Sequence, residues 1–282
     1  MNKIAAAFIA SCRDEIEAPK PGNVHIFAAG HGMTADEFLR SAEAAAPAIG
    51  ESSALVGDRI IAAVEATWAS VGMNTNLGII LLCAPLAAAA QMGGDLQSAL
   101  KSVLAGLTRA DAAAAFRAIL RASPAGLGEA PRHDVRNAPN ATLLEAMRAA
   151  ADRDRIAYQY AFDFADVFET GMAAFDAARR ESWPAPWPTV AVYLAFLASF
   201  PDSHIARKTG PASAATVQGE AANLRQRFVR YSNPAEALPD LLAFDQRLKA
   251  AGLNPGTSAD LTVATVFADH LTRILIERRN NG

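Results

Sequence analysis

Apolar residues recur along most of this chain every three to four positions, which is the spacing of one buried face on an α-helix. Ala, Leu, Arg and Glu fill these segments, and all four are strong helix formers. Runs that alternate apolar and polar residues are nearly absent, so the pattern argues against a Rossmann or barrel fold. We predict helices at residues 3–18, 35–48, 51–71, 77–92, 96–105, 109–121, 141–150, 153–180, 188–200, 212–230, 234–251 and 258–278. The chain is therefore expected to be all-α, a single compact multi-helix domain of about ten to twelve helices that spans residues 1–282.

The most apolar stretch, residues 77–90, is 14 residues long and contains Pro85. A helix needs about 20 apolar residues to cross a bilayer, so we predict a buried helix that is kinked or broken near Pro85. The start of the chain resembles a short lipoprotein signal that ends at Cys12, but Arg13 and acidic residues follow at once. A first helix is the better interpretation.

Composition narrows the class of ligand. Hydrophobic residues make up 51% of the chain and charged residues 20%, as in an ordinary globular protein. The net charge of −3 gives no general attraction to nucleic acid or to an anionic membrane, so an anionic ligand must be met by local positive charge. Cys12 and Cys83 have no paired spacing that would suggest zinc, and they suit a reduced, cytoplasmic protein. We expect small-molecule partners and no nucleic acid or membrane partner, and the sequence leaves a homodimer open.

Polar side chains gather in four turns between the predicted helices. The first turn, Pro19 to His25, combines two stiffening prolines and a glycine with Lys20 and His25. Its alternative is a helix stop with incidental polar residues. The second turn places Asn74-Thr75-Asn76 directly before the apolar helix. Capping explains one of these side chains, but the free N–H groups of a helix N-terminus also suit phosphate.

The third turn, residues 201–210, carries Asp202, Ser203 and His204 in a row. Catalytic triads are assembled from positions distant in sequence, so we reject a triad here. Arg207 and Lys208 could clamp phosphates, or they could form an exposed basic turn. The fourth turn, residues 253–260, leads into the last helix, where Asp260 is favoured by the helix dipole in any case.

Three further features set limits on the function. Lys208-Thr209 lacks the upstream glycines of a phosphate-binding P-loop, which excludes that motif. Acidic residues between positions 152 and 169 could hold Mg²⁺, although a solvated acidic face is the simpler interpretation. The irregular stretch 122–140 is long for a compact domain, and such loops are more often functional than idle.

In this order the four turns resemble the triphosphoribosyl-dephospho-coenzyme A synthase family, which builds the prosthetic-group precursor of citrate and malonate decarboxylating lyases. The matching pieces are Pro19-Lys20-Pro21-Gly22, Asn74-Thr75-Asn76-x-Gly78, Asp202-Ser203 with Arg207-Lys208, and Pro255-Gly256-x-Ser258-Ala259-Asp260-Leu261. They span nearly the whole chain. Asp134-Val135 and residues 154–158 look like the branch found in archaea and in one-carbon-metabolising bacteria.

The resemblance implies an all-α transferase that binds ATP with Mg²⁺. In the family reaction the 2′-hydroxyl of dephospho-coenzyme A attacks the anomeric carbon of the ATP ribose and expels adenine. Positive groups must hold the triphosphate, a carboxylate should accept the hydroxyl proton, and the site must tolerate an oxocarbenium-like transition state.

The resemblance also suggests roles for individual residues. Asp202 and Asp260 are the candidate catalytic residues, and Asp134, Asp154 and Asp202 are the candidate metal ligands. The expected nucleotide and phosphate contacts are Lys20, Gly22, His25, Asn74, Thr75, Asn76, Arg207, Lys208, Gly256 and Ser258.

This chain departs from the citrate/malonate branch at two of the turns. That branch carries Pro-Lys-Pro-Gly-Leu-Val-Asp where this chain has Asn23-Val24-His25, and Asn-Thr-His-Lys-Gly where it has Asn76-Leu77. A related branch could therefore transfer a phosphorylated ribosyl unit to another acceptor, such as a precursor of a methanopterin-type cofactor. The remaining alternatives are a non-catalytic nucleotide-binding homologue and a helical hydrolase with an Asp-bound metal.

Overall fold

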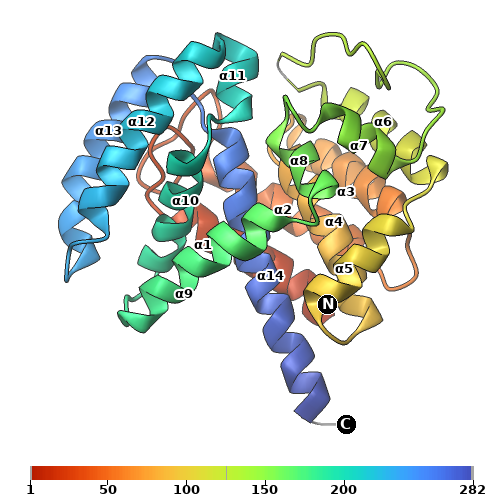
Figure 1. Ribbon diagram of the computed structural model, residues 1–282, viewed down its shortest axis with the longest axis horizontal. Helices are drawn as coiled ribbons and strands as arrows, with labels where there is room; N and C mark the ends of the chain where they lie inside the picture. Colours follow the sequence, from red (N-terminus) through yellow and green to blue (C-terminus); the bar gives the residue numbers. More distant parts are fainter. Residues whose placement is uncertain (1, 125, 281–282) are drawn as a thin grey trace. The chain divides into compact units, whose positions relative to one another are not determined.

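The computed structural model describes residues 2–124 and 126–280, and across those residues the fold is all-α (Figure 1). They contain fourteen α-helices, one π-helix and one short 3₁₀ helix. In the same residues no strand forms, and the only β pairing is two isolated bridges, His25–Ala28 and Gly30–Met33. The predicted fold class is confirmed, whereas the predicted number of helices is too low.

Contacts between α-carbons divide the chain into two compact units. Among the described residues, unit 1 takes residues 2–12, 37–124, 126–164 and 267–280, and unit 2 takes residues 13–36 and 165–266. Helices α1 (Lys3–Glu17) and α14 (Gly256–Asn280) contribute residues to both units. Neither unit is a single continuous segment, and one domain over residues 1–282 remains a prediction.

Unit 1 is built around α4, whose residues are apolar on every side. Its helices are α2 (Ala35–Gly50), α3 (Val56–Val71), α4 (Leu77–Met92), α5 (Leu96–Ala105), α6 (Arg109–Ala122), α7 (Leu143–Ala150) and α8 (Arg155–Ala161). Helix α4 packs against α3, α5, α6 and α8, and twelve of its residues are buried, as its hydrophobic run predicts. Within the described chain no single helix is long and apolar enough to cross a membrane; only α4 and α5 together, joined at a 113° bend, meet that criterion of length and composition.

Helix α4 continues through Pro85, so of the predicted kink or break the break is wrong, and the kink remains a prediction. A proline has no N–H to donate to the carbonyl four residues before it, which here is that of Leu81. The hydroxyl of Tyr160, from α8, donates to Leu81 O over 2.6 Å. The carbonyl that the proline leaves unpaired is therefore satisfied by a neighbouring helix.

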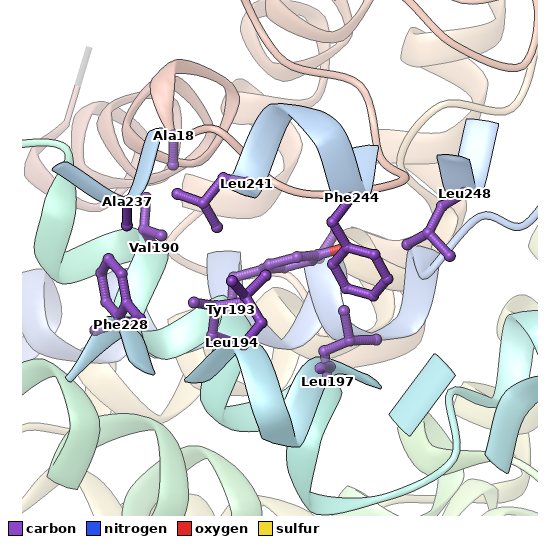
Figure 2. Packing of buried hydrophobic residues seen from close by; sticks show 14 of the residues in the cluster. Ala18, Val190, Tyr193, Leu194, Leu197, Phe228, Ala237, Leu241, Phe244 and Leu248 are labelled. Atoms are coloured by element: carbon purple, nitrogen blue, oxygen red, sulfur yellow. The ribbon is translucent and has the colours of Figure 1, made fainter. Parts of the chain in front are cut away.

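Unit 2 surrounds α10, the second strongly apolar helix. Its elements are the π-helix η1 (Asp166–Gly171), α9 (Met172–Arg180), α10 (Trp187–Ser199), α11 (Ser203–Thr209), α12 (Pro211–Phe228), the 3₁₀ helix η2 (Pro234–Ala237) and α13 (Leu238–Ala250). Figure 2 shows Tyr193, Leu194 and Leu197 of α10 among buried side chains of α12 and α13, including Phe228 and Phe244. This core fixes the helices whose ends carry the first, third and fourth polar turns.

The structure departs most from the prediction in two segments. The helix predicted at residues 153–180 is divided into α8, η1 and α9, because Asp163 and Phe164 adopt left-handed backbone angles, with φ of 52° and 60°. Phe164 is fully buried, and its N–H donates to Gln159 O over 2.8 Å, so a packed turn interrupts a segment of high helix propensity. The third polar turn contains the short helix α11, which begins after Asp202 and ends before Gly210.

Candidate active site

The loop that follows α1 closes around Lys20, which is completely buried in unit 2. Its ammonium forms an ion pair with Glu15 and donates to Asn23 Oδ1 over 3.3 Å. Burial lowers the pKa of Lys20 and raises that of Glu15, and the attraction within the pair opposes both shifts. In this conformation Lys20 ties the loop to α1, so a direct phosphate contact remains a prediction.

Gly22 lies where the loop passes closest to the rest of unit 2. Its φ is 83°, and a Cβ built on it would stand 2.8 Å from Pro255 Cδ and 2.9 Å from Leu248 Cδ1. Its N–H donates to Asp245 Oδ1 over 2.8 Å, and Lys249 donates to the same carboxylate over 3.0 Å. A larger residue would both strain the backbone and separate the loop from the turn before α14.

His25 is buried beside the same carboxylate. Its Nε2 lies 3.4 Å from Asp245 Oδ1, yet neither ring nitrogen makes a well-aligned hydrogen bond within the described residues. Burial lowers the pKa of His25, although the carboxylate of Asp245 opposes this shift. Where the citrate/malonate pattern has an acidic residue, this chain thus places a histidine against an acidic residue of α13.

Two further hydrogen bonds connect the first turn to distant parts of unit 2. Asn23 Nδ2 donates to Asn254 Oδ1 over 2.9 Å, which joins the first turn to the fourth. The buried hydroxyl of Tyr193 donates to Pro21 O over 2.6 Å. The first and fourth turns therefore lie together, and α10 supports them from the core.

Asp202 joins the third turn to the fourth. One carboxylate oxygen accepts from the backbone N–H groups of His204 (2.9 Å) and Ile205 (3.2 Å), which caps α11. The other accepts from the N–H and the hydroxyl of Ser258, both at 2.8 Å. Asp202 has no exposed surface, and burial raises its pKa while the four donors oppose the shift. Both of its oxygens are engaged in holding two helix N-termini side by side.

Positive charge is concentrated on α11. Arg207 and Lys208 are exposed on its last turn, and with His31 they reinforce the effect of burial, which lowers the pKa of His204 to about 4. The His204 ring lies over Gly256, since a Cβ there would be 3.0 Å from its Nδ1. A neutral imidazole, under the influence of two cations of α11, therefore lies against the beginning of α14.

Asp260 lies half-buried on the first turn of α14. It acts electrostatically on Lys20, raising the pKa of that ammonium. Asp260 therefore belongs to the same part of unit 2 as the first turn, and unlike Asp202 it retains exposed surface.

The second polar turn belongs to unit 1. Asn74 Oδ1 accepts from Leu77 N over 3.1 Å, and the Thr75 hydroxyl donates to Ser41 Oγ over 2.6 Å. Asn76 precedes α4 without capping it, and its side-chain Nδ2 is buried with no hydrogen-bond partner in the described chain. A buried, unpaired donor at a helix N-terminus is costly unless a ligand satisfies it, so this turn is suited to an anion.

The carboxylates predicted to bind a metal have other contacts. Asp134 accepts from Ala130 N, Arg136 N and the Arg136 guanidinium, and Asp154 caps α8. Among the residues that the structure describes, no three His, Cys, Asp or Glu side chains are grouped to hold a metal ion. The predicted metal set of Asp134, Asp154 and Asp202 therefore gains no support from the geometry.

Comparison with known proteins places the chain in a family. The family model described as CitG, ATP:dephospho-CoA triphosphoribosyl transferase, matches residues 1–279. The chain belongs to the ATP:dephospho-CoA triphosphoribosyl transferase family. The family predicted from the four turns is thus confirmed over its full length, and with it a transferase that uses ATP.

A crystal structure supports the fold of this transferase-family chain. It is that of a protein from Archaeoglobus fulgidus, provisionally described as a triphosphoribosyl-dephospho-CoA synthase, with a TM-score of 0.62 and 24% sequence identity. The match covers 82% of this chain and 96% of the archaeal one. Among curated proteins, none matches the chain.

Several residues that hold the candidate site in unit 2 together were not predicted from the sequence. Glu15, Asp245, Lys249 and Asn254 hold the first turn in place. A signal for Glu15 exists, because it falls four positions after Ser11 on the buried face of α1, where an acid needs a partner. No comparable local signal marks Asn254 or the bridge from Asp202 to the next turn.

Proposed function

We propose that this chain transfers the triphosphoribosyl group of ATP to the 2′-hydroxyl of dephospho-coenzyme A. The hydroxyl oxygen forms a bond to the anomeric carbon, the bond from that carbon to adenine breaks, and the hydroxyl proton passes to a base. The observation that carries the proposal is the family match over residues 1–279. Its support from the structure is that the first, third and fourth turns of the family pattern meet in unit 2.

We assign the general base to Asp260 and a positioning role to Asp202. A base must reach substrate, whereas Asp202 is fully buried and its oxygens accept four hydrogen bonds. Asp260 has exposed surface and lies one helical turn into α14. Asp202 would act by fixing the direction of α14, and so the place of Asp260.

The triphosphate needs positive charge, which we assign in unit 2 to Arg207 and Lys208, the exposed cations of α11. In unit 1, Asn76 Nδ2 and the N-terminus of α4, which Asn76 does not cap, are by themselves suited to an anion. The start of α14 is a weaker phosphate site, because Ser258 N already donates to Asp202 and Gly256 N to Asn254 O.

The described residues do not fit a magnesium site held by the protein alone. Mg²⁺ usually retains several waters and binds through substrate phosphates with one or two carboxylates. We therefore expect the ion to enter with the nucleotide, where it would offset the charge of the triphosphate.

The acceptor follows from the family and is the finer part of the proposal. Asn23 and His25, where the chain departs from the citrate/malonate pattern, are both buried against partners within unit 2. These two departures in the first turn therefore alter the support of the loop more than its exposed surface. This favours dephospho-coenzyme A over a methanopterin-type precursor, and the assay below includes both classes of acceptor.

The test is adenine release from ATP and Mg²⁺, monitored by chromatography with no acceptor, with dephospho-coenzyme A, or with a methanopterin-type precursor. We expect adenine only with dephospho-coenzyme A, together with a triphosphoribosylated product of matching amount. Asp260→Asn should abolish adenine release with an unchanged melting temperature. Asp240→Asn is the control and should retain adenine release, because Asp240 is an exposed residue of α13 that pairs with Arg227 of α12. Release of ADP would identify a hydrolase, no product with any acceptor would identify a non-catalytic homologue, and wild-type release by Asp260→Asn would refute the assigned base.

A further inference from the structure

The long loop after α6 forms a pocket together with α7 in unit 1. The pocket has a volume of about 400 Å³, and its polar lining comes from Arg132, His133, Asn140, Glu145 and Arg148. None of these side chains belongs to the four turns of the family pattern. The pocket therefore needs an explanation of its own.

The loop is held in one conformation by Asp134. Its carboxylate accepts from Ala130 N over 2.8 Å and from Arg136 N over 3.0 Å, and it receives two bonds from the Arg136 guanidinium, at 2.8 and 2.6 Å. These donors, chiefly Arg136, lower the pKa of Asp134 well below its usual value. The pocket wall is thus built by a network of internal bonds before any ligand arrives.

Internal contacts also determine which charged side chains of the pocket remain available to a ligand. Arg136 is engaged by Asp134 and Glu129, and Glu145 accepts from Thr142 N and Oγ1 in the capping box of α7. By contrast, the guanidinium groups of Arg132 and Arg148 make no hydrogen bond or ion pair within residues 2–124 and 126–280. Two arginines against one acidic side chain leave the pocket with excess positive charge.

Neutral donors complete the lining. His133 Nδ1 lies 3.1 Å from Asn140 Oδ1, which orients the Asn140 amide so that its NH₂ group is not used in that bond. His133 adopts a left-handed backbone, with φ of 51°. Arginine forks and amide donors are the groups that recognise phosphate oxygens in proteins.

We propose that this pocket binds a phosphate-class anion, most simply a diphosphate. Two guanidinium groups match two adjacent phosphoryl groups, and the volume exceeds what one phosphate would fill. The diphosphate could be inorganic, or it could be the diphosphate bridge of an acceptor such as dephospho-coenzyme A. The pocket itself does not rest on the proposed function, because none of the residues assigned to the transfer reaction lines it.

The test uses inorganic diphosphate as the probe and the full-length protein. The chain has five histidines, so the imidazole resonances are few enough to assign by substitution, with His133→Gln locating the pocket. We expect diphosphate to shift the His133 resonance in a saturable manner. Replacing Arg132 and Arg148 together by Gln should weaken that binding by about tenfold or more, since a hydrogen bond to a charged group contributes about 1.5–3 kcal/mol. Arg117→Gln, an exposed arginine of α6 outside the pocket, is the matched control.

Two outcomes would overturn the proposal: diphosphate binding that leaves the His133 resonance unmoved, or equal affinity in the double variant and in Arg117→Gln. The source of the anion follows from a second measurement. A raised KM for dephospho-coenzyme A in the double variant, with diphosphate as a competitive inhibitor of the wild type, identifies the acceptor's bridge. An unchanged KM with lost diphosphate binding identifies a separate inorganic anion site.

Discussion

Asp202 provides the sharpest test of how unit 2 is held together. Its four accepted hydrogen bonds join the N-terminus of α11 to that of α14. Replacing it by Ala removes an N-cap, which contributes about 1 kcal/mol, and leaves the N–H and hydroxyl of Ser258 buried without an acceptor. An orphaned buried donor costs about 1–3 kcal/mol, so we expect Asp202→Ala to lower the free energy of unfolding by about 4 kcal/mol.

Asp202→Asn separates the two halves of this interaction. The amide oxygen can still cap α11, but its NH₂ group faces the N–H of Ser258, donor against donor. We expect a loss of about 2 kcal/mol, or a melting temperature lower by roughly 4 °C in a chain of this size. Asp95→Asn is the matched control, since Asp95 caps α5 on the protein surface and Asn is an equally good N-cap.

Urea unfolding followed by far-UV circular dichroism, with differential scanning calorimetry, measures both variants. A double-mutant cycle with Ser258→Ala should give a coupling energy of about 1 kcal/mol or more. If Asp202→Ala unfolds within about 1 kcal/mol of the wild type, the bridging role is refuted. If Asp202→Asn has wild-type stability but no adenine release, Asp202 takes part in the reaction itself.

Three further predictions concern the same unit. Gly22→Ala should lower the free energy of unfolding by at least about 2 kcal/mol, because the added Cβ meets two side chains at a positive φ. Gly219→Ala, in the open interior of α12, should raise it by about 1 kcal/mol, and thermal melts that rank the two variants the other way would contradict the close approach at Gly22. Glu15→Gln leaves the buried Lys20 ammonium without its ion-pair partner and should lower the free energy of unfolding, measured with urea, by about 3–5 kcal/mol. The double variant with Lys20→Met should recover much of this loss. An equally unstable double variant would show that the ion pair is not the cause. His204 is neutral in the folded protein because its pKa lies at about 4. Its contribution to the free energy of unfolding is therefore present above the unfolded pKa of about 6.5 and is lost as the pH falls from there towards 4, by on the order of 2 kcal/mol at pH 5. If the stability of His204→Gln parallels that of the wild type between pH 7.5 and 5, His204 is not the cause of this loss.

The hydrophobic pattern was sufficient for most helices because α4 and α10 carry uninterrupted apolar runs that only a buried helix accommodates. It failed at Phe164, where burial of one ring holds a left-handed turn inside a segment of helix-forming residues. Propensity sums over a window and does not register a single packed turn. The helix count was too low for this reason and because α11 spans only seven residues.

The candidate site shows a similar division. A helix N-terminus is usually capped by a side chain next to its own first turn, but the acceptor for Ser258 N at the start of α14 is Asp202, 56 positions away. Three of the four turns named by the family order lie together in unit 2, while the partners within them depend on contacts between distant positions. Lys20 is an example. A lysine between two prolines in a turn would ordinarily be exposed, but Lys20 is buried and forms an ion pair with Glu15.

The hydrogen bond from Tyr160 to Leu81 links two positions that share no motif and are 79 residues apart. Tyr160 is needed because Pro85 takes away the usual donor for that carbonyl, and the proline is tolerated because the tyrosine supplies another. Related chains that have an ordinary residue in place of this proline no longer require the hydroxyl, and phenylalanine should then be accepted at the tyrosine position. The two sites are therefore expected to vary as a pair, and their joint variation would trace the packing of α4 against α8 through the family.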